Sequence, residues 1–164
     1  MFSEAWLQRP MYAILNNPKL VHLFKRLNMS FMSAKSEVLA FGEQPTVEHI
    51  MPQEWAANWR LPDGSKGFTY LELYQVPESD PRAIASRKRD AAVQTLGNLT
   101  ILSSSLNSAQ SNSGWQQKRP AMMKHSLLPI NQTISGLEGW DESEISKRGM
   151  ELFQRALTIW PRST

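Results

Sequence analysis

Cysteine is absent from this chain of 164 residues. Without thiols, the protein can form neither disulfide bonds nor cysteine-based zinc sites. We therefore expect no structural zinc, and we expect the protein in a reducing compartment, the cytoplasm. The N-terminal residues also lack the charged start and the sustained apolar run of a secretory signal.

Long apolar runs and a large net charge are missing as well. No stretch approaches the roughly 18 consecutive apolar residues of a membrane helix, so we expect no membrane segment. The formal net charge of +3 permits a polyanionic partner but does not require one. Histidine is scarce, with three in the chain, so the position of each is informative. Hydrophobic residues make up 41% of the chain, enough for one well-filled core.

The pattern of apolar residues predicts one α+β domain, 1–164, that is mainly α-helical. We expect a helical N-terminal part, a central part and a helical C-terminal part, at 1–42, 43–125 and 126–164. Two short strands are predicted, within 43–53 and at 99–102, because both stretches are short and carry β-branched and apolar residues. Together they predict a two-stranded antiparallel hairpin.

Periodicity and capping residues predict the helices. They are expected at 4–29, 81–95, 104–125 and from 141 toward the C-terminus. Asp80 before Pro81 has the pattern of an N-cap with proline in the first turn, and Gly97 marks the end of that helix. Asp141 and Glu144 have the spacing of a capping box.

Prolines and apolar stripes refine these helices. The first segment is expected to be interrupted at Pro10 and Pro18, and the segment 104–125 at Gly114 or Pro120. Side chains at helical spacing are expected in the core. They are Leu20, Leu23, Phe24 and Leu27 in the first segment and Ile145, Leu152, Phe153, Ala156 and Trp160 in the last.

Two motifs carry the candidate chemistry. The stretch VEHIMPQEW places Glu48 directly before His49, and LGNLTILSSSLNSAQSN carries Asn98, Asn107 and Asn112. A hairpin followed by a helix brings the end of one strand and the start of the helix together, so we expect Glu48, His49 and Asn107 to converge. Oxygen and nitrogen donors of this kind suit a hard cation. Structural roles are the alternative, with His49 in the core and the asparagines in turns or helix caps.

The motifs EHIMPQ, GNLTIL, LN, SN and QQK follow one another in an order that resembles the HNH, or ββα-metal, endonucleases. More specifically, the chain resembles the C-terminal nuclease domain of GmrSD-type and SspE-type restriction proteins. Those domains also carry a tryptophan near position 140 and an I-x-x-R helix that ends in tryptophan, matched here by Ile145, Arg148 and Trp160. The resemblance extends over 47–160 and implies a hairpin-plus-helix site embedded in surrounding helices.

The resemblance implies a role for each motif residue in DNA hydrolysis. His49 matches the general base that takes a proton from water. Glu48 and Asn107 match the residues that hold one divalent ion, Mg²⁺ or Mn²⁺, and Asn112 is the alternative to Asn107. Asn98 matches the asparagine that steadies the hairpin and orients the histidine.

Basic residues flank the proposed site and are candidates for contacts with the DNA backbone. Lys118 matches a family lysine that touches the scissile phosphate. Further contacts are expected from Arg87, Lys88, Arg89 and Arg119. Such contacts would position DNA without reading its bases. A solvated helix face is the alternative for each of them.

Two features depart from the family pattern. Glu48 stands where aspartate is frequent, which changes the reach of the carboxylate. The interval between His49 and Asn98 is much longer than in minimal members of the class. We expect the long insertion at 55–96 to host a loop that contacts DNA.

The resemblance thus implies a metal-dependent DNA endonuclease that nicks or cuts DNA as the effector of an anti-phage or modification-dependent restriction system. The expected partners are DNA and an N-terminal nucleotide-hydrolysing, modification-sensing domain of the same parent protein, from which this chain would be an excised part. The alternative is a catalytically degenerate domain of the same fold that binds DNA or docks on a partner.

Overall fold

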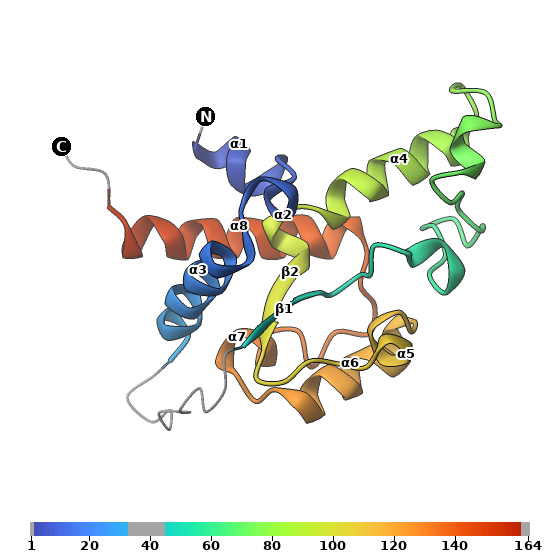
Figure 1. Cartoon of the computed structure of the whole chain (residues 1–164). Helices are drawn as coiled ribbons and strands as arrows, with labels where there is room; N and C mark the ends of the chain where they lie inside the picture. Colours follow the sequence, from blue (N-terminus) through green and yellow to red (C-terminus); the bar gives the residue numbers. More distant parts are fainter. Residues whose placement is uncertain (1, 33–44, 162–164) are drawn as a thin grey trace.

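The computed structural model describes residues 2–32 and 45–161 and shows a small β-hairpin surrounded by helices (Figure 1). The strands are β1 (Thr46–His49) and β2 (Leu99–Leu102). The α-helices are α1 (Phe2–Leu7), α2 (Met11–Ile14), α3 (Asn17–Ser30), α4 (Pro81–Val93), α5 (Ser108–Ser111), α6 (Trp115–His125), α7 (Pro129–Gln132) and α8 (Glu142–Ile159). Short 3₁₀ helices are η1 (Trp55–Ala57), η2 (Glu72–Tyr74) and η3 (Leu96–Asn98). The predicted α+β class, mainly helical with a two-stranded antiparallel hairpin, is confirmed.

The register of the hairpin decides which side chains share a face. Glu48 lies opposite Thr100, and His49 lies opposite Leu99. Side chains alternate along a strand, and directly paired residues of two strands point to the same face. His49 therefore shares one face with Leu99, and Glu48 shares the other face with Thr100.

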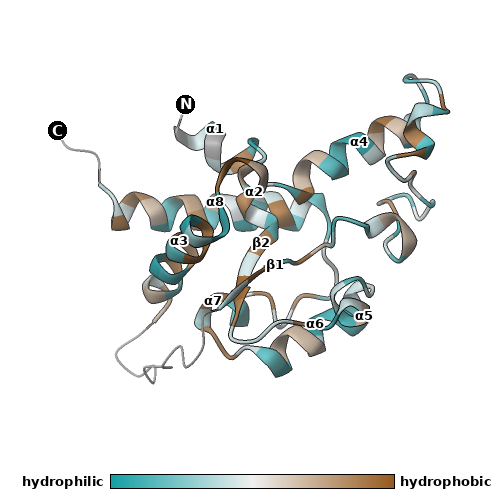
Figure 2. Ribbon diagram, in the orientation of Figure 1, coloured by the Kyte–Doolittle hydropathy of each residue, from teal (hydrophilic) through white to brown (hydrophobic). Residues whose placement is uncertain are grey.

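Hydrophobic clusters cover the hairpin on both faces. Leu99 and Ile101 pack in a cluster with apolar side chains of α1, α3 and α8. Leu102 belongs to a second cluster, which contains Trp55, Trp59, Trp115 and Trp140. Figure 2 shows polar and apolar residues alternating along α4 and α8, as expected for helices with one buried face. No helix within 2–32 or 45–161 is long and apolar enough to span a bilayer.

Side-chain caps fix where the long helices begin. Asp80 accepts hydrogen bonds from two backbone N–H groups in the first turn of α4, and Asp141 does the same for α8. Both predicted caps are confirmed, and they satisfy donors that a first helical turn leaves free. Asn16 caps α3, with Pro18 in the first turn. This proline therefore starts a helix instead of interrupting one.

The predicted breaks are right in part. Pro10 lies between α1 and α2, as expected. The polar segment after β2 is divided at Gly114, the N-cap of α6, whereas Pro120 lies inside that helix. The predicted boundary at residues 42 and 43 falls outside the described residues.

Most of the predicted core residues are buried. The fully or nearly fully buried ones are Leu20, Phe24, Leu27, Ile145, Leu152 and Ala156, with Leu23 and Phe153 partly buried. Trp160 was expected in the core, and that prediction is wrong. It is the C-cap of α8 and is 37% exposed. In Figure 1 the last turn of α8 extends beyond the helices that pack on its middle, so the apolar stripe leaves the core there.

The start of β2 lies tightly against α8. A Cβ added at Gly97 would lie 2.2 Å from the backbone oxygen of Ile145, and Gly149 faces Gly97 across the same contact. Arg148 of α8 donates hydrogen bonds to the carbonyl oxygens of Gly97 at 2.8 Å and Leu99 at 2.7 Å. Glycine is therefore required at position 97 by the close approach of α8.

Replacing Gly97 with alanine should destabilise the fold, because the new methyl group would collide with the backbone of α8. We expect the free energy of unfolding in urea to fall by about 2 kcal/mol or more. Gly136→Ala is the matched control, since nothing lies within 4 Å of a Cβ built there. Its stability should stay within about 0.5 kcal/mol of the wild type. Equal stability of the two variants would contradict the packing of η3 on α8.

Candidate active site at the end of the hairpin

A buried asparagine fixes the chain that follows His49. The Oδ1 of Asn98 accepts hydrogen bonds from the backbone N–H of Met51 at 2.8 Å and from the indole of Trp140 at 3.0 Å. Its Nδ2 donates to the carbonyl oxygens of Met51 at 2.8 Å and Val93 at 3.0 Å. With both ends of the amide satisfied, Asn98 ties the turn after β1 to the end of α4. This fits the steadying role that the resemblance implies for it.

The imidazole of His49 is enclosed at the end of β1. The residue is 9% exposed, and its Nε2 is buried without a hydrogen-bond partner in the part of the chain that the structure describes. The ring of Tyr12, from α2, covers it in an edge contact with 4.3 Å between ring centroids. The side chain of Gln94, at the C-terminal end of α4, also interacts with the ring.

Burial makes His49 a neutral imidazole. It lowers the pKa from 6.5 to about 4, because the imidazolium form loses its hydration. The interaction with Gln94 raises the pKa, but by less than burial lowers it, and the positive charge of Lys118 lowers it further. At neutral pH the ring therefore carries a lone pair that can accept a proton.

Lys118 lies in the interior of the protein, on the other face of the hairpin. Its side chain is fully buried, and Nζ lies 2.7 Å from Oε1 of Glu48. The same ammonium donates to the carbonyl oxygens of His49 at 2.6 Å and Ser111 at 2.5 Å. Burial lowers the pKa of Lys118, and the carboxylate of Glu48 opposes this shift. With three acceptors for its three donors, Lys118 clamps β1 to α5 and α6, which argues against the predicted contact with a scissile phosphate.

The predicted cation ligands either cap α5 or contact it. Oε1 of Glu48 accepts a hydrogen bond at 2.7 Å from the hydroxyl of Ser111, in the last turn of α5. Asn107 is the exposed N-cap of the same helix, and its side chain accepts a hydrogen bond from the backbone of the first turn. Asn112 is the C-cap of α5. Glu48 and Asn107 therefore lie at the two ends of one helical turn, α5. The hairpin-plus-helix prediction expected these two residues near each other, and this part of it agrees with the structure.

The hairpin separates His49 from these oxygen ligands. Glu48 meets α5 and α6 on one face, and His49 meets α2 and α4 on the other. The prediction that Glu48, His49 and Asn107 converge is therefore wrong for their side chains in this conformation. The physical reason is that neighbouring residues of a strand point to opposite faces.

The donor atoms near α5 fit a divalent ion in type. Glu48 and Asn107 supply carboxylate and amide oxygens, which hard cations such as Mg²⁺ take. Oε1 of Glu48 already bonds Lys118, so an ion would share this carboxylate with a positive charge. No group of three or more histidine, aspartate or glutamate side chains able to hold a metal occurs among the residues that the structure describes. The ligand types fit a hard cation, and most of its coordination sphere would come from water or substrate.

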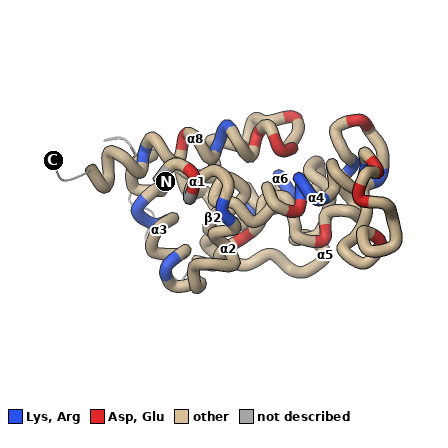
Figure 3. Tube along the Cα trace, turned by 90° about the horizontal axis from the view of Figure 1, so that it is seen from above, with Lys and Arg blue, Asp and Glu red and all other residues tan. Residues whose placement is uncertain are grey.

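The predicted DNA-contacting residues differ in their exposure. Lys88 is exposed on α4. Arg89 is buried and pairs with Glu142 at 2.7 Å, which argues against a DNA contact. Arg87 and Arg119 are partly buried and donate to backbone carbonyl groups. Figure 3 shows lysine and arginine interspersed with aspartate and glutamate around α4 and α8.

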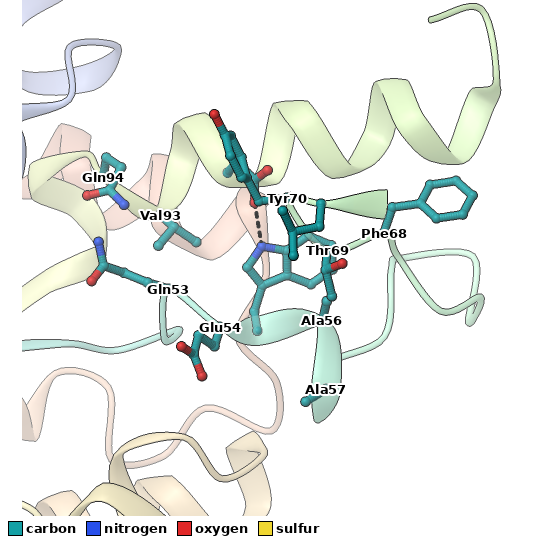
Figure 4. A pocket seen from close by; sticks show the side chains of 12 residues that line it. Gln53, Glu54, Ala56, Ala57, Phe68, Thr69, Tyr70, Val93 and Gln94 are labelled. Carbon is teal, nitrogen blue, oxygen red and sulfur yellow. Dashed lines mark hydrogen bonds between the residues drawn. The ribbon is translucent and has the colours of Figure 1, made fainter. Parts of the chain in front are cut away.

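The sequence did not predict that Tyr12 and Gln94 contact His49, nor that a pocket lies beside it. Tyr12 and Gln94 lie outside the motifs, and no pattern in the sequence marks them as neighbours of the imidazole. A pocket of about 640 Å³ adjoins the site at Gln94 (Figure 4). It lies between the chain that follows β1, the segment 68–71 and the C-terminal end of α4.

Comparison with known proteins gives a family match over nearly the whole chain. The family model described as GmrSD restriction endonucleases, C-terminal domain, matches residues 1–155. The match includes α1 to α3, where the motifs gave little signal. Searches of the curated proteins and of the solved structures found no match.

Lys118→Met should destabilise the protein strongly, because it leaves the carboxylate of Glu48 without its buried cation. We expect a loss of about 3–5 kcal/mol in the free energy of unfolding, measured in urea. Lys124→Met, which changes an exposed lysine of the same helix, should stay within about 0.5 kcal/mol of the wild type. The double variant Glu48→Gln with Lys118→Met removes both charges and should recover part of the loss. Similar stability of the two lysine variants would disprove the buried ion pair.

Proposed function

The chain belongs to the family of C-terminal domains of GmrSD restriction endonucleases, and we propose that it is the DNA-cleaving effector domain of a restriction system. Its reaction would be the hydrolysis of phosphodiester bonds by an activated water, with His49 as the general base. DNA as substrate and an N-terminal domain of the same parent protein as partner are part of this proposal.

The state of His49 is the observation that carries the proposal. Hydrolysis needs a group that takes a proton from the attacking water. Burial keeps the His49 imidazole neutral at pH 7, and its Nε2 has no hydrogen-bond partner among the described residues. A buried polar atom left without a partner is costly and calls for an explanation, and a catalytic role is one such explanation. Nε2 is the atom at which we place the proton transfer.

Tyr12 has to leave its place before this chemistry can occur. Its ring edge packs on His49, and Nε2 is closed to solvent. The helix that carries it, α2, has four residues and buries none of them. A hydrogen bond of 3.2 Å from the Tyr12 N–H to the Gln94 carbonyl holds it at the end of α4. Because α2 is held by few contacts, displacing it costs little free energy, and the displacement would admit water to Nε2 of His49.

Two residues act as positioning groups in the proposed reaction. Asn98 fixes the backbone of Met51, and Lys118 fixes the carbonyl of His49. Both side chains are buried and fully bonded, so the end of β1 is held from each side of the hairpin. Neither group needs to contact DNA in order to keep the imidazole in place.

A divalent ion, Mg²⁺ or Mn²⁺, belongs to the proposal with Glu48 and Asn107 as its protein ligands. When bound, it would stabilise the charge that develops on the phosphate and on the leaving oxygen. Because Glu48 and His49 face opposite sides of the hairpin, the two side chains would have to approach each other before both could act on one phosphate. The proposal assigns a contact with the DNA backbone to Lys88, which is exposed on α4.

The ion pair of Glu48 with Lys118 also favours a second candidate function. A lysine that already neutralises the carboxylate is a feature expected of a domain that has lost its metal. Such a domain would bind DNA or a partner without cleaving. The two candidates differ in whether any divalent ion supports cleavage.

Supercoiled plasmid incubated with the protein in Mg²⁺, in Mn²⁺ and in EDTA tests the nuclease directly. We expect relaxed or linear DNA with either metal and intact plasmid in EDTA. His49→Ala should slow cleavage by about 100-fold or more, because it removes the general base. The matched control is His125→Ala, since this partly buried histidine lies at the end of α6 and meets Ser104.

The control should cleave at the wild-type rate, and both variants should retain the circular dichroism spectrum of the folded protein. Cleavage by folded His49→Ala at the wild-type rate would remove His49 from the mechanism. Intact plasmid under all conditions, together with retained DNA binding, would favour the second candidate.

A further inference from the structure

The pocket beside Gln94 is built from three segments that are far apart in sequence. Its walls come from the chain after β1, from the segment 68–71 and from the end of α4. Figure 4 shows Gln53 and Gln94 at one end of the pocket and Tyr70 on the other side, with Val93 between the two glutamines and Tyr70. At about 640 Å³ the pocket is in the range of small-molecule sites.

The lining of the pocket has polar edges, two carboxylates (Glu54 and Asp90) and no positive charge. None of its lining residues within the described chain is a lysine, arginine or histidine. Trp55 and Val93 provide buried apolar surface, while Gln53 and Gln94 offer amide groups that both donate and accept. Asp90 accepts a hydrogen bond of 2.7 Å from the Trp55 indole, so its carboxylate is held in place. Such a lining does not suit a phosphate, and it suits a neutral flat group with hydrogen-bonding edges.

Tyr70 gives the pocket an aromatic surface that is open to solvent. The residue is 68% exposed, although a tyrosine ring gains by burial. It is held by Tyr74, whose ring meets it edge-on at 5.1 Å and whose hydroxyl is hydrogen-bonded to the hydroxyl of Tyr70. An exposed aromatic ring that is already oriented is a stacking surface for a flat ligand.

We propose that this pocket binds an unpaired nucleobase of the DNA strand beside the scissile phosphate. The base stacks on Tyr70, and the amides of Gln53 and Gln94 meet its hydrogen-bonding edge. This inference rests on the proposed function, because it names the part of the DNA that the same site takes.

Position and charge connect the pocket to the proposed active site. Gln94 lines the pocket and also interacts with the ring of His49. Gln53 follows His49 closely in the chain, after the turn that Asn98 fixes. One cation lies just outside the pocket: Arg87 lines an adjoining hollow that shares Tyr70 and Asp90 with it and also contains Glu78. A base inside the pocket, with its phosphates outside and away from the carboxylates of Glu54 and Asp90, matches this lining.

A binding experiment in EDTA tests the pocket without cleavage. The probe is a duplex with a single unpaired 2-aminopurine, whose fluorescence reports stacking, and the reference is the same duplex with an abasic residue at that position. At fixed salt, we expect the wild type to bind the 2-aminopurine duplex at least about fivefold more tightly than the abasic one. Tyr70→Ala should abolish this preference and the change in fluorescence.

The control variant is Trp160→Ala, which removes an exposed aromatic side chain at the far end of α8. It should keep the preference for the unpaired base, and both variants should melt within a few degrees of the wild type. Equal affinity of the wild type for the two duplexes, an unchanged preference in Tyr70→Ala, or no binding of either duplex would each overturn the proposal.

Plasmid cleavage measured in parallel separates this inference from the proposed function. Cleavage without a preference for the unpaired base would support the proposed nuclease and contradict base binding in the pocket. A preference for the unpaired base that depends on Tyr70, without cleavage in any metal, would support the pocket and contradict the nuclease.

Discussion

The buried ammonium of Lys118 is the interaction on which the arrangement of this site depends. A charge withdrawn from water is tolerated only when each of its donors finds an acceptor. Lys118 finds the Glu48 carboxylate and the carbonyl oxygens of His49 and Ser111. These acceptors come from β1 and from the end of α5, so one side chain of α6 fixes a strand and a helix together. An acidic residue is therefore needed at position 48 for structural reasons, whether or not it also holds a metal ion.

The opposite face of the hairpin keeps His49 neutral and covered. Burial lowers its pKa to about 4, and the same burial closes Nε2 to water under Tyr12. A general base works best with a pKa near the working pH, so the covered imidazole is a weak base. Displacing Tyr12 would hydrate the ring, raise its pKa and admit water together. Tyr12 of α2 thus covers the candidate base, and the family match includes this N-terminal part of the chain.

Local patterns were sufficient to predict the strands and the helix caps at Asp80 and Asp141, because each depends on nearby residues. The steadying role of Asn98 was implied by the family resemblance, and its hydrogen bonds fit that role. Burial of charges was not predictable in this way. Lys118 and Arg89 looked like surface cations, since the carboxylates of Glu48 and Glu142 that permit their burial lie far away in sequence. The cover that Tyr12 forms over His49 depends on tertiary packing alone. Glu48 and His49 lie on different faces of the hairpin because neighbouring residues of a strand alternate in direction. The prediction that Glu48, His49 and Asn107 converge did not take this alternation into account.

The most direct test of His49 as the base is the pH dependence of cleavage under kcat/KM conditions, in the wild type and in Tyr12→Ala. A group that must be unprotonated loses activity as pH falls through its pKa in the free enzyme. For the wild type we expect this loss near pH 4. In Tyr12→Ala, with the ring hydrated, the loss should move up toward the unperturbed value of 6.5. The same acid limb in both proteins, with both still folded, would contradict the assignment of His49 as the general base.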